Sequence, residues 1–146
     1  MQEFSLTTGL QNTMFGTSAG TNLQTGLGNS LFGNFAGISL IGGANNTLLG
    51  LQAGNNLVSG NNVICVGRQA GTAYTSNESD NICIGNPGIE GDNGITRIGT
   101  TGTHVVTFIS GQIVGENGSA ASPTFIIILS SVTLGCTKVD SSPLIS

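Results

Sequence analysis

Charged residues are scarce in this 146-residue chain. Asp, Glu, Lys and Arg together make up 7% of it, and the formal net charge is −4. Globular proteins typically carry about 25% charged residues. The only cations are Arg68, Arg97 and Lys138. Because nucleic-acid binding depends on many basic side chains that neutralise phosphates, the composition argues against a nucleic-acid partner.

Long apolar stretches are also lacking. The longest run, FIIIL at 125–129, is far too short to cross a bilayer as a helix. The first residues, MQEFSLTTGL, have neither the basic region nor the apolar run of a secretory signal. We therefore expect no membrane insertion, and no signal peptide is visible.

Residues that commonly build reactive sites are few. His104 is the only histidine, and the three cysteines have no metal-ligand spacing, so a solvated or capping role suits His104 better than metal binding. Serine is abundant and Asp80, Asp92 and Asp140 are present, but nothing in the sequence places them beside His104. No phosphate-binding glycine loop with its lysine occurs. We predict no catalytic, metal or cofactor site and no enzymatic activity.

Glycine, in contrast, is abundant and regularly spaced. Of the 24 glycines, Gly16, Gly33, Gly50 and Gly67 lie seventeen residues apart. A unit of this length is too short for the helical repeats, which need about 33 residues or more. Each short segment TMF, SLF, TLL or ICV is followed by glycine, as expected where a strand reaches a corner. The repeat predicts a β-solenoid in which seventeen residues form one coil.

Stacked coils would align equivalent residues into ladders. The first apolar ladder consists of Met14, Leu31, Leu48, Cys65 and Cys83. The second consists of Phe15, Phe32, Leu49, Val66 and Ile84. A third apolar ladder consists of Leu23, Leu40, Leu57 and Tyr74, and a polar column consists of Asn12, Asn29 and Asn46.

The first two ladders are adjacent in every strand, and adjacent strand residues point to opposite faces. One ladder therefore fills the coil while the other faces outward as an apolar stripe, which is typical of an interface. The sequence leaves open which ladder is inside. The alternative is that bulges at the glycines turn both ladders inward. We favour an oligomer interface and assign it to the second ladder, Phe15, Phe32, Leu49, Val66 and Ile84.

The spacing changes after Gly67. Gly85 follows eighteen residues later and Gly99 fourteen after that. We divide the chain into a lead-in (1–11), regular coils (12–80), irregular coils (81–115) and a strand-rich C-terminal segment (116–146). Among the charges at 89–99, an ion pair involving Glu90, Asp92 and Arg97 is favoured over a receptor contact.

Cys65 and Cys83 occupy successive positions of one ladder, so their Cα atoms are expected about 5 Å apart, within disulfide range. Two small apolar side chains filling a coil are the favoured interpretation, with a disulfide as the alternative.

The repeats NTMFGTSAG, NSLFGNFAG and NTLLGLQAG resemble the heads of trimeric autotransporter adhesins. They resemble more closely the repeat-rich stalks of phage and viral tail-fibre proteins that precede an intramolecular chaperone. This resemblance implies three chains side by side as a fibre, with apolar ladders at the axis. In that family a self-cleaving chaperone follows the segment ending near Ser142, whereas this sequence ends at Ser146, so no chaperone residue is carried over.

We therefore expect an all-β chain: a short β-solenoid, or β-roll, of about six or seven rungs with a strand-rich C-terminal closure, assembled as a homotrimer. The expected function is a structural fibre or stalk on a virion or cell surface that contacts a host receptor or glycan. A self-assembling extracellular filament is the alternative. A ligand- or ice-binding solenoid is the minor one, because its threonine column would be interrupted. That column runs Thr13, Ser30, Thr47 and Ile64.

Overall fold

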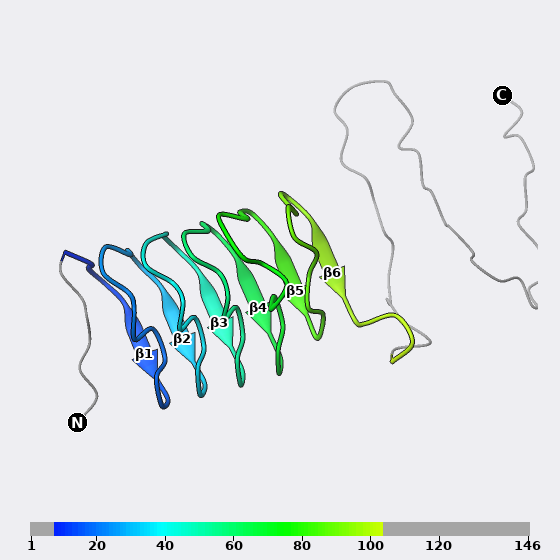
Figure 1. Ribbon diagram of the computed structural model, residues 1–146, viewed down its shortest axis with the longest axis horizontal. Helices are drawn as coiled ribbons and strands as arrows, with labels where there is room; N and C mark the ends of the chain where they lie inside the picture. Colours follow the sequence, from blue (N-terminus) through cyan, green and yellow to red (C-terminus); the bar gives the residue numbers. More distant parts are fainter. Residues whose placement is uncertain (1–7, 104–146) are drawn as a thin grey trace, which may run out of the picture. The chain divides into compact units, whose positions relative to one another are not determined.

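The computed structural model describes residues 8–103, and within this range every regular element is a β-strand. The six strands are β1 (Thr13–Phe15), β2 (Ser30–Phe32), β3 (Thr47–Leu49), β4 (Ile64–Val66), β5 (Ile82–Ile84) and β6 (Thr96–Ile98). They form one six-stranded sheet in the order β1-β2-β3-β4-β5-β6, stacked side by side along the solenoid (Figure 1). The all-β solenoid expected from the repeat is confirmed.

All neighbouring strands are parallel, so the chain completes one coil between each strand and the next. Thr13 pairs with Ser30, and Ser30 pairs with Thr47, which are the equivalent positions of the seventeen-residue repeat. The described part of the chain contains about five turns. The irregular coils keep the same register, because Ile82 pairs with both Ile64 and Thr96 despite the altered spacing.

The middle residue of each strand points into the coil. Leu31, Leu48, Cys65 and Cys83 are fully buried, and the partly buried Met14 packs against the same core. The first ladder is therefore the inner one. Across the coil it faces the third ladder, Leu23, Leu40, Leu57 and Tyr74, which is also fully buried. Burying a large apolar side chain contributes about 1.5–3 kcal/mol, so these two ladders stabilise each coil against its neighbours.

The predicted asparagine column links the coils by side-chain amides. The Nδ2 of Asn29 donates to Oδ1 of Asn12 at 3.0 Å, and the Nδ2 of Asn46 donates to Oδ1 of Asn29 at 2.9 Å. Each amide also donates to a glycine carbonyl, Gly43 for Asn29 and Gly60 for Asn46. The next position of the column is Val63, which cannot continue the amide chain.

Glycine is required where each strand ends. Gly33 has φ 138°, and a Cβ added there would lie 2.6 Å from the carbonyl carbon of Gly50 in the next coil. Real Cβ atoms do not approach backbone this closely, and a side chain at this φ is strained. The corner glycines therefore allow the coils to stack at the strand spacing of about 4.8 Å.

The first coil begins within the predicted lead-in. The backbone N–H of Thr8 donates to the carbonyl of Gln24, and Leu10 forms a parallel bridge with Leu27. Residues 8–11 thus already stack on the second coil. Residues 1–7, the end of the irregular coils at 104–115 and the C-terminal segment 116–146 lie outside the described residues.

Candidate functional site: an outer apolar ladder

The third residue of each strand faces away from the core and is apolar in all six strands. We call this set the outer ladder: Phe15, Phe32, Leu49, Val66, Ile84 and Ile98. Phe15 is 72% exposed, Leu49 47% and Ile98 54%. The structure therefore places the five residues of the predicted interface in one outward-facing row, in which Val66 is half-buried, and extends the row by a sixth.

Ile98 was missed as a member of this row. The sequence signal for it exists, because Ile98 is followed by Gly99 as Phe32 is by Gly33. The fourteen-residue spacing hid it, since a strict seventeen-residue alignment does not reach this position. Register in the sheet, not spacing along the chain, assigns Ile98 to the ladder.

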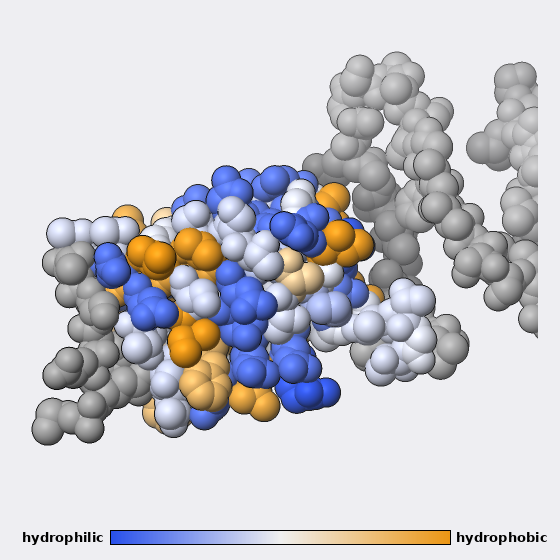
Figure 2. Space-filling model, viewed as in Figure 1, coloured by the Kyte–Doolittle hydropathy of each residue, from blue (hydrophilic) through white to orange (hydrophobic). Residues whose placement is uncertain are grey.

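The outer ladder begins with two aromatic rings in contact. The centroids of Phe15 and Phe32 lie 6.3 Å apart with their planes inclined at 32°. This separation is within the range of favourable aromatic pairs. On the side of the molecule shown in Figure 2, hydrophobic side chains form groups among hydrophilic ones, so apolar surface is not confined to the core.

The first residue of each strand also faces outward, but its column is mixed. It runs Thr13, Ser30, Thr47, Ile64, Ile82 and Thr96. The register confirms that isoleucine interrupts the threonine column at two adjacent coils. A continuous threonine face, which an ice-binding surface would need, is therefore not formed in the described sheet.

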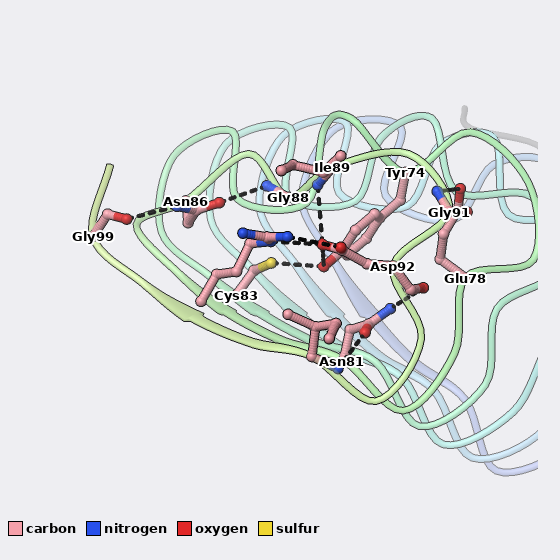
Figure 3. Close-up of polar contacts among 12 residues, drawn as sticks. Tyr74, Glu78, Asn81, Cys83, Asn86, Gly88, Ile89, Gly91, Asp92 and Gly99 are labelled. Carbon is pink, nitrogen blue, oxygen red and sulfur yellow. Dashed lines mark hydrogen bonds and ion pairs between the residues drawn. The ribbon is translucent and has the colours of Figure 1, made fainter. Parts of the chain in front are cut away.

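A polar cluster lies at the β6 end of the core, where Arg97 takes the inward position that Cys83 holds in β5. We call Tyr74, Cys83, Asp92 and Arg97 the terminal polar cluster, of which Tyr74, Cys83 and Asp92 are labelled in Figure 3. Arg97 donates to Asp92 through Nε at 2.7 Å and through a terminal nitrogen at 2.8 Å. The Tyr74 hydroxyl donates to Oδ2 of Asp92 at 3.4 Å and lies 2.9 Å from Sγ of Cys83.

The predicted ion pair thus forms between Asp92 and Arg97, and it is more buried than a surface pair. Asp92 is 8% exposed, whereas Glu90 is exposed and takes no part in the pair. The hydrogen bonds from Arg97 hold the pKa of the Asp92 carboxyl below its usual value, although burial opposes this. An arginine inside the coil replaces the apolar ladder at β6.

Glu78 is a second buried carboxylate, and the residue types around it do not predict its burial. It is 3% exposed and accepts backbone N–H bonds from Ser76 at 3.0 Å and Gly91 at 3.2 Å. Burial raises the pKa of this carboxyl, but the backbone N–H bonds outweigh burial and lower it. The only sequence signal is the eighteen-residue spacing, which shows one extra residue in this coil.

A pocket of about 400 Å³ lies at the corners of the last coils. Arg68, Thr72, Asn86 and Thr103 are among its lining residues. Arg68 donates to the side-chain oxygen of its neighbour Gln69 at 2.9 Å. Asn86 is already bonded on both sides, to the carbonyl of Gly99 and the N–H of Gly88. Arg68 supplies the charged side chain in the lining of this pocket.

The remaining candidate residues do not come together. Between residues 8 and 103, no group of three His, Cys, Asp or Glu side chains is placed to hold a metal ion. Asp80 accepts a hydrogen bond from Asn62, and Asp92 is paired with Arg97. His104, Cys136, Lys138 and Asp140 lie outside the described residues.

The class that the geometry defines is a β-solenoid with one parallel sheet and an exposed apolar ladder. Over the described coils, no helix is long and apolar enough to cross a membrane. Comparisons with protein-family models, curated proteins and solved structures find no significant match to the chain.

Proposed function

We propose that this chain is a structural fibre or stalk protein that assembles as a homotrimer through the outer ladder. The observation that carries the proposal is the row of six outward-facing apolar residues, one per strand, of which five are exposed and Val66 is half-buried. Contiguous exposed apolar surface of this kind marks interaction sites in soluble proteins. In a closed, three-fold assembly the same row of each chain would meet at the axis.

The free energy available from the outer ladder supports a stable assembly. Burying each large apolar side chain contributes about 1.5–3 kcal/mol, so the row contributes on the order of 10 kcal/mol per chain. Part of this offsets the loss of translational and rotational freedom on association. Because every coil adds one residue to the row, the interface grows in step with the length of the solenoid.

The stalk role follows from how the solenoid is built. Each coil hydrogen-bonds mainly to its neighbours, so the rod lengthens by about 4.8 Å per coil without a change in cross-section. Charge is low and the backbone is densely paired, which suits an exposed, protease-rich setting on a virion or cell surface. We also propose that the stalk contacts a host receptor or glycan, and the pocket lined by Arg68 supports this part of the proposal.

Two matched substitutions test the assembly. Leu49 and Leu27 are 47% and 45% exposed, but only Leu49 belongs to the outer ladder. Asparagine is native to the Leu27 column, because Asn61 follows Ala44 there. We expect Leu49→Asn to weaken the oligomer by about tenfold or more in dissociation constant, while Leu27→Asn leaves it unchanged. Sedimentation velocity over a concentration series measures both, and equal effects would contradict the proposal.

A self-assembling filament is the second candidate, and the sheet edges favour it. Within the described residues, β1 and β6 each have a strand neighbour on one side only. Unpaired edges of parallel sheets can pair with another chain and propagate without closing. A filament would give species of increasing length with concentration, whereas the closed trimer gives one mass.

A further inference from the structure

Two cysteine side chains lie one above the other inside the solenoid. Cys65 is the middle residue of β4, Cys83 is the middle residue of β5, and the parallel register pairs them directly. Both are fully buried, and both are free thiols in this structure. Neighbouring strands lie about 4.8 Å apart, which falls within the Cα separations of about 4.4–6.8 Å seen in disulfides.

The surrounding residues hold both sulfur atoms in the same part of the coil. Sγ of Cys65 fills the space in which a Cβ on Gly71 would lie, and the Tyr74 ring borders this space. Sγ of Cys83 lies 2.9 Å from the Tyr74 hydroxyl (Figure 3). The parallel register makes Cys65 and Cys83 direct partners on neighbouring strands, with both side chains inside the coil. Proximity and orientation therefore favour a bond between the two sulfurs over a reaction with any other group.

The Tyr74 hydroxyl contacts Cys83 and not Cys65, which makes the two thiols unequal. The neighbouring Cys65 thiol lowers the pKa of the Cys83 thiol against the opposing effect of burial, and the contact with the Tyr74 hydroxyl adds to the lowering. The same pairing, together with burial, raises the pKa of Cys65. We take Cys83 as the nucleophile of the pair, because the Tyr74 hydroxyl 2.9 Å from its sulfur can stabilise the thiolate, which is the reactive form.

The pair lies where another link between coils is interrupted. The asparagine column connects Asn29 to Asn46 but meets Val63 in the next coil, two residues before Cys65. The column resumes only at Asn81, whose amide donates to the carbonyl of Asp92. Inside the coil, the step from the fourth to the fifth coil therefore lacks the amide bond of the asparagine column, and the side-chain amide bond at this step lies on the exposed face, from Asn62 to Asp80.

We propose that Cys65 and Cys83 form a disulfide that joins β4 to β5 when the protein is exposed to a small peroxide. The Cys83 thiolate attacks one oxygen of hydrogen peroxide, the O–O bond breaks, and hydroxide leaves, which gives a sulfenic acid on Cys83. The Cys65 sulfur then attacks Sγ of Cys83, the S–O bond breaks, and the hydroxyl leaves with the Cys65 proton as water. The two sulfurs are oxidised and the peroxide is reduced to water.

This disulfide would covalently link equivalent positions of two successive coils, so that one full coil forms a closed loop. A disulfide that closes a loop of this length stabilises a protein mainly by restricting its unfolded state. The fourth and fifth coils would then be joined by a covalent bond at the step that the asparagine column leaves open. The assignment does not depend on the proposed fibre function, because it rests on register and burial within one chain.

The test uses the full chain carrying Cys136→Ser, so that only Cys65 and Cys83 can react. The protein is treated with equimolar hydrogen peroxide, alkylated with iodoacetamide in denaturant, and mapped by peptide mass spectrometry. We expect the two cysteine peptides to be linked with the loss of two hydrogen atoms. We also expect the thermal midpoint to rise by at least about 5 °C and to fall back with dithiothreitol.

Cys65→Ser and Cys83→Ser in the same background are the matched controls, and neither should gain thermal stability on treatment. If these variants fail to fold by circular dichroism, the reversible shift in the parent protein remains the deciding measurement. Three outcomes would overturn the proposal: both cysteines still alkylated after peroxide, oxidation to sulfinic acid without linkage, or a linked chain whose midpoint is unchanged or lower.

Discussion

At the scale of the residue, the solenoid depends on positions where the surrounding structure requires one particular type of amino acid. Gly33 is such a position, because its φ of 138° and the backbone of Gly50 leave no room for a Cβ. Asp92 is another, because its carboxylate is almost buried and holds Arg97 and the N–H of Ile89. Each position makes a separate prediction.

Gly33→Ala should lower the free energy of unfolding by about 2 kcal/mol or more, because strain and a backbone clash add together. Gly42→Ala is the matched control. Gly42 lacks this positive φ, and its added Cβ meets only the Thr25 hydroxyl oxygen at 3.2 Å. Urea unfolding at fixed chain concentration measures both variants. Similar losses for both would show that the corner geometry is not what requires glycine.

The Asp92–Arg97 pair makes stability depend on pH. The pKa of Asp92 is lower in the folded protein than in the unfolded chain, with the hydrogen bonds from Arg97 as the main cause. The contribution of Asp92 to the free energy of unfolding is therefore fully present above its unfolded pKa of about 4. It is lost as the pH falls through the lower pKa that Asp92 has in the folded protein. Glu78, whose pKa is also lowered, adds a loss of the same sign.

Asp92→Asn should be less stable than the wild type at pH 7, and this difference should shrink at pH 3. The exposed Glu90 provides the control, Glu90→Gln, which should follow the wild-type pH profile. The urea midpoints of the wild type and both variants, measured at pH 7 and pH 3, test this prediction. A difference between Asp92→Asn and wild type that is as large at pH 3 as at pH 7 would refute the linkage.

At the scale of the element, each strand is only three residues long, so hydrogen bonds between coils hold the strands in place. Asn46 shows this best, since its side chain bonds to Asn29, the carbonyl of Gly60 and the N–H of Val63. Its neighbours in the column are buried, so water cannot replace these bonds. The column is therefore a structural link between the second, third and fourth coils.

Asn46→Ala should destabilise the protein by about 2–4 kcal/mol, because it leaves several buried polar groups without partners. Asn77→Ala removes the same side chain at an exposed position and should change stability by less than about 0.5 kcal/mol. Thermal and urea unfolding of the two variants provide the comparison. A loss below about 1 kcal/mol for Asn46→Ala would mean that the column does not link the coils.

The elements also show how far the sequence predicts this fold. The seventeen-residue spacing predicts the strands, their register and the asparagine column, because stacking requires equivalent residues to align. It does not predict which ladder is inside, because both are apolar and alternation only requires them to be opposite. Arg97 inside the coil was also missed, since its partner Asp92 lies in a coil of altered length.

At the scale of the whole molecule, the inner ladders fill the coil and the outer ladder remains exposed. The side chains at opposite ends of this row, Phe15 and Ile98, are 72% and 54% exposed. A single chain thus presents a row of apolar side chains to water along all six strands. The proposed homotrimer removes that row from water.

The native mass of the purified chain, measured by native mass spectrometry across a dilution series, tests this claim most directly. The account predicts one mass, that of three chains, which persists on dilution because a continuous apolar interface dissociates slowly. Species of ever-increasing size would instead favour the filament. A monomer at every concentration would contradict the proposed homotrimer, because the outer ladder would then remain exposed to solvent in the native protein.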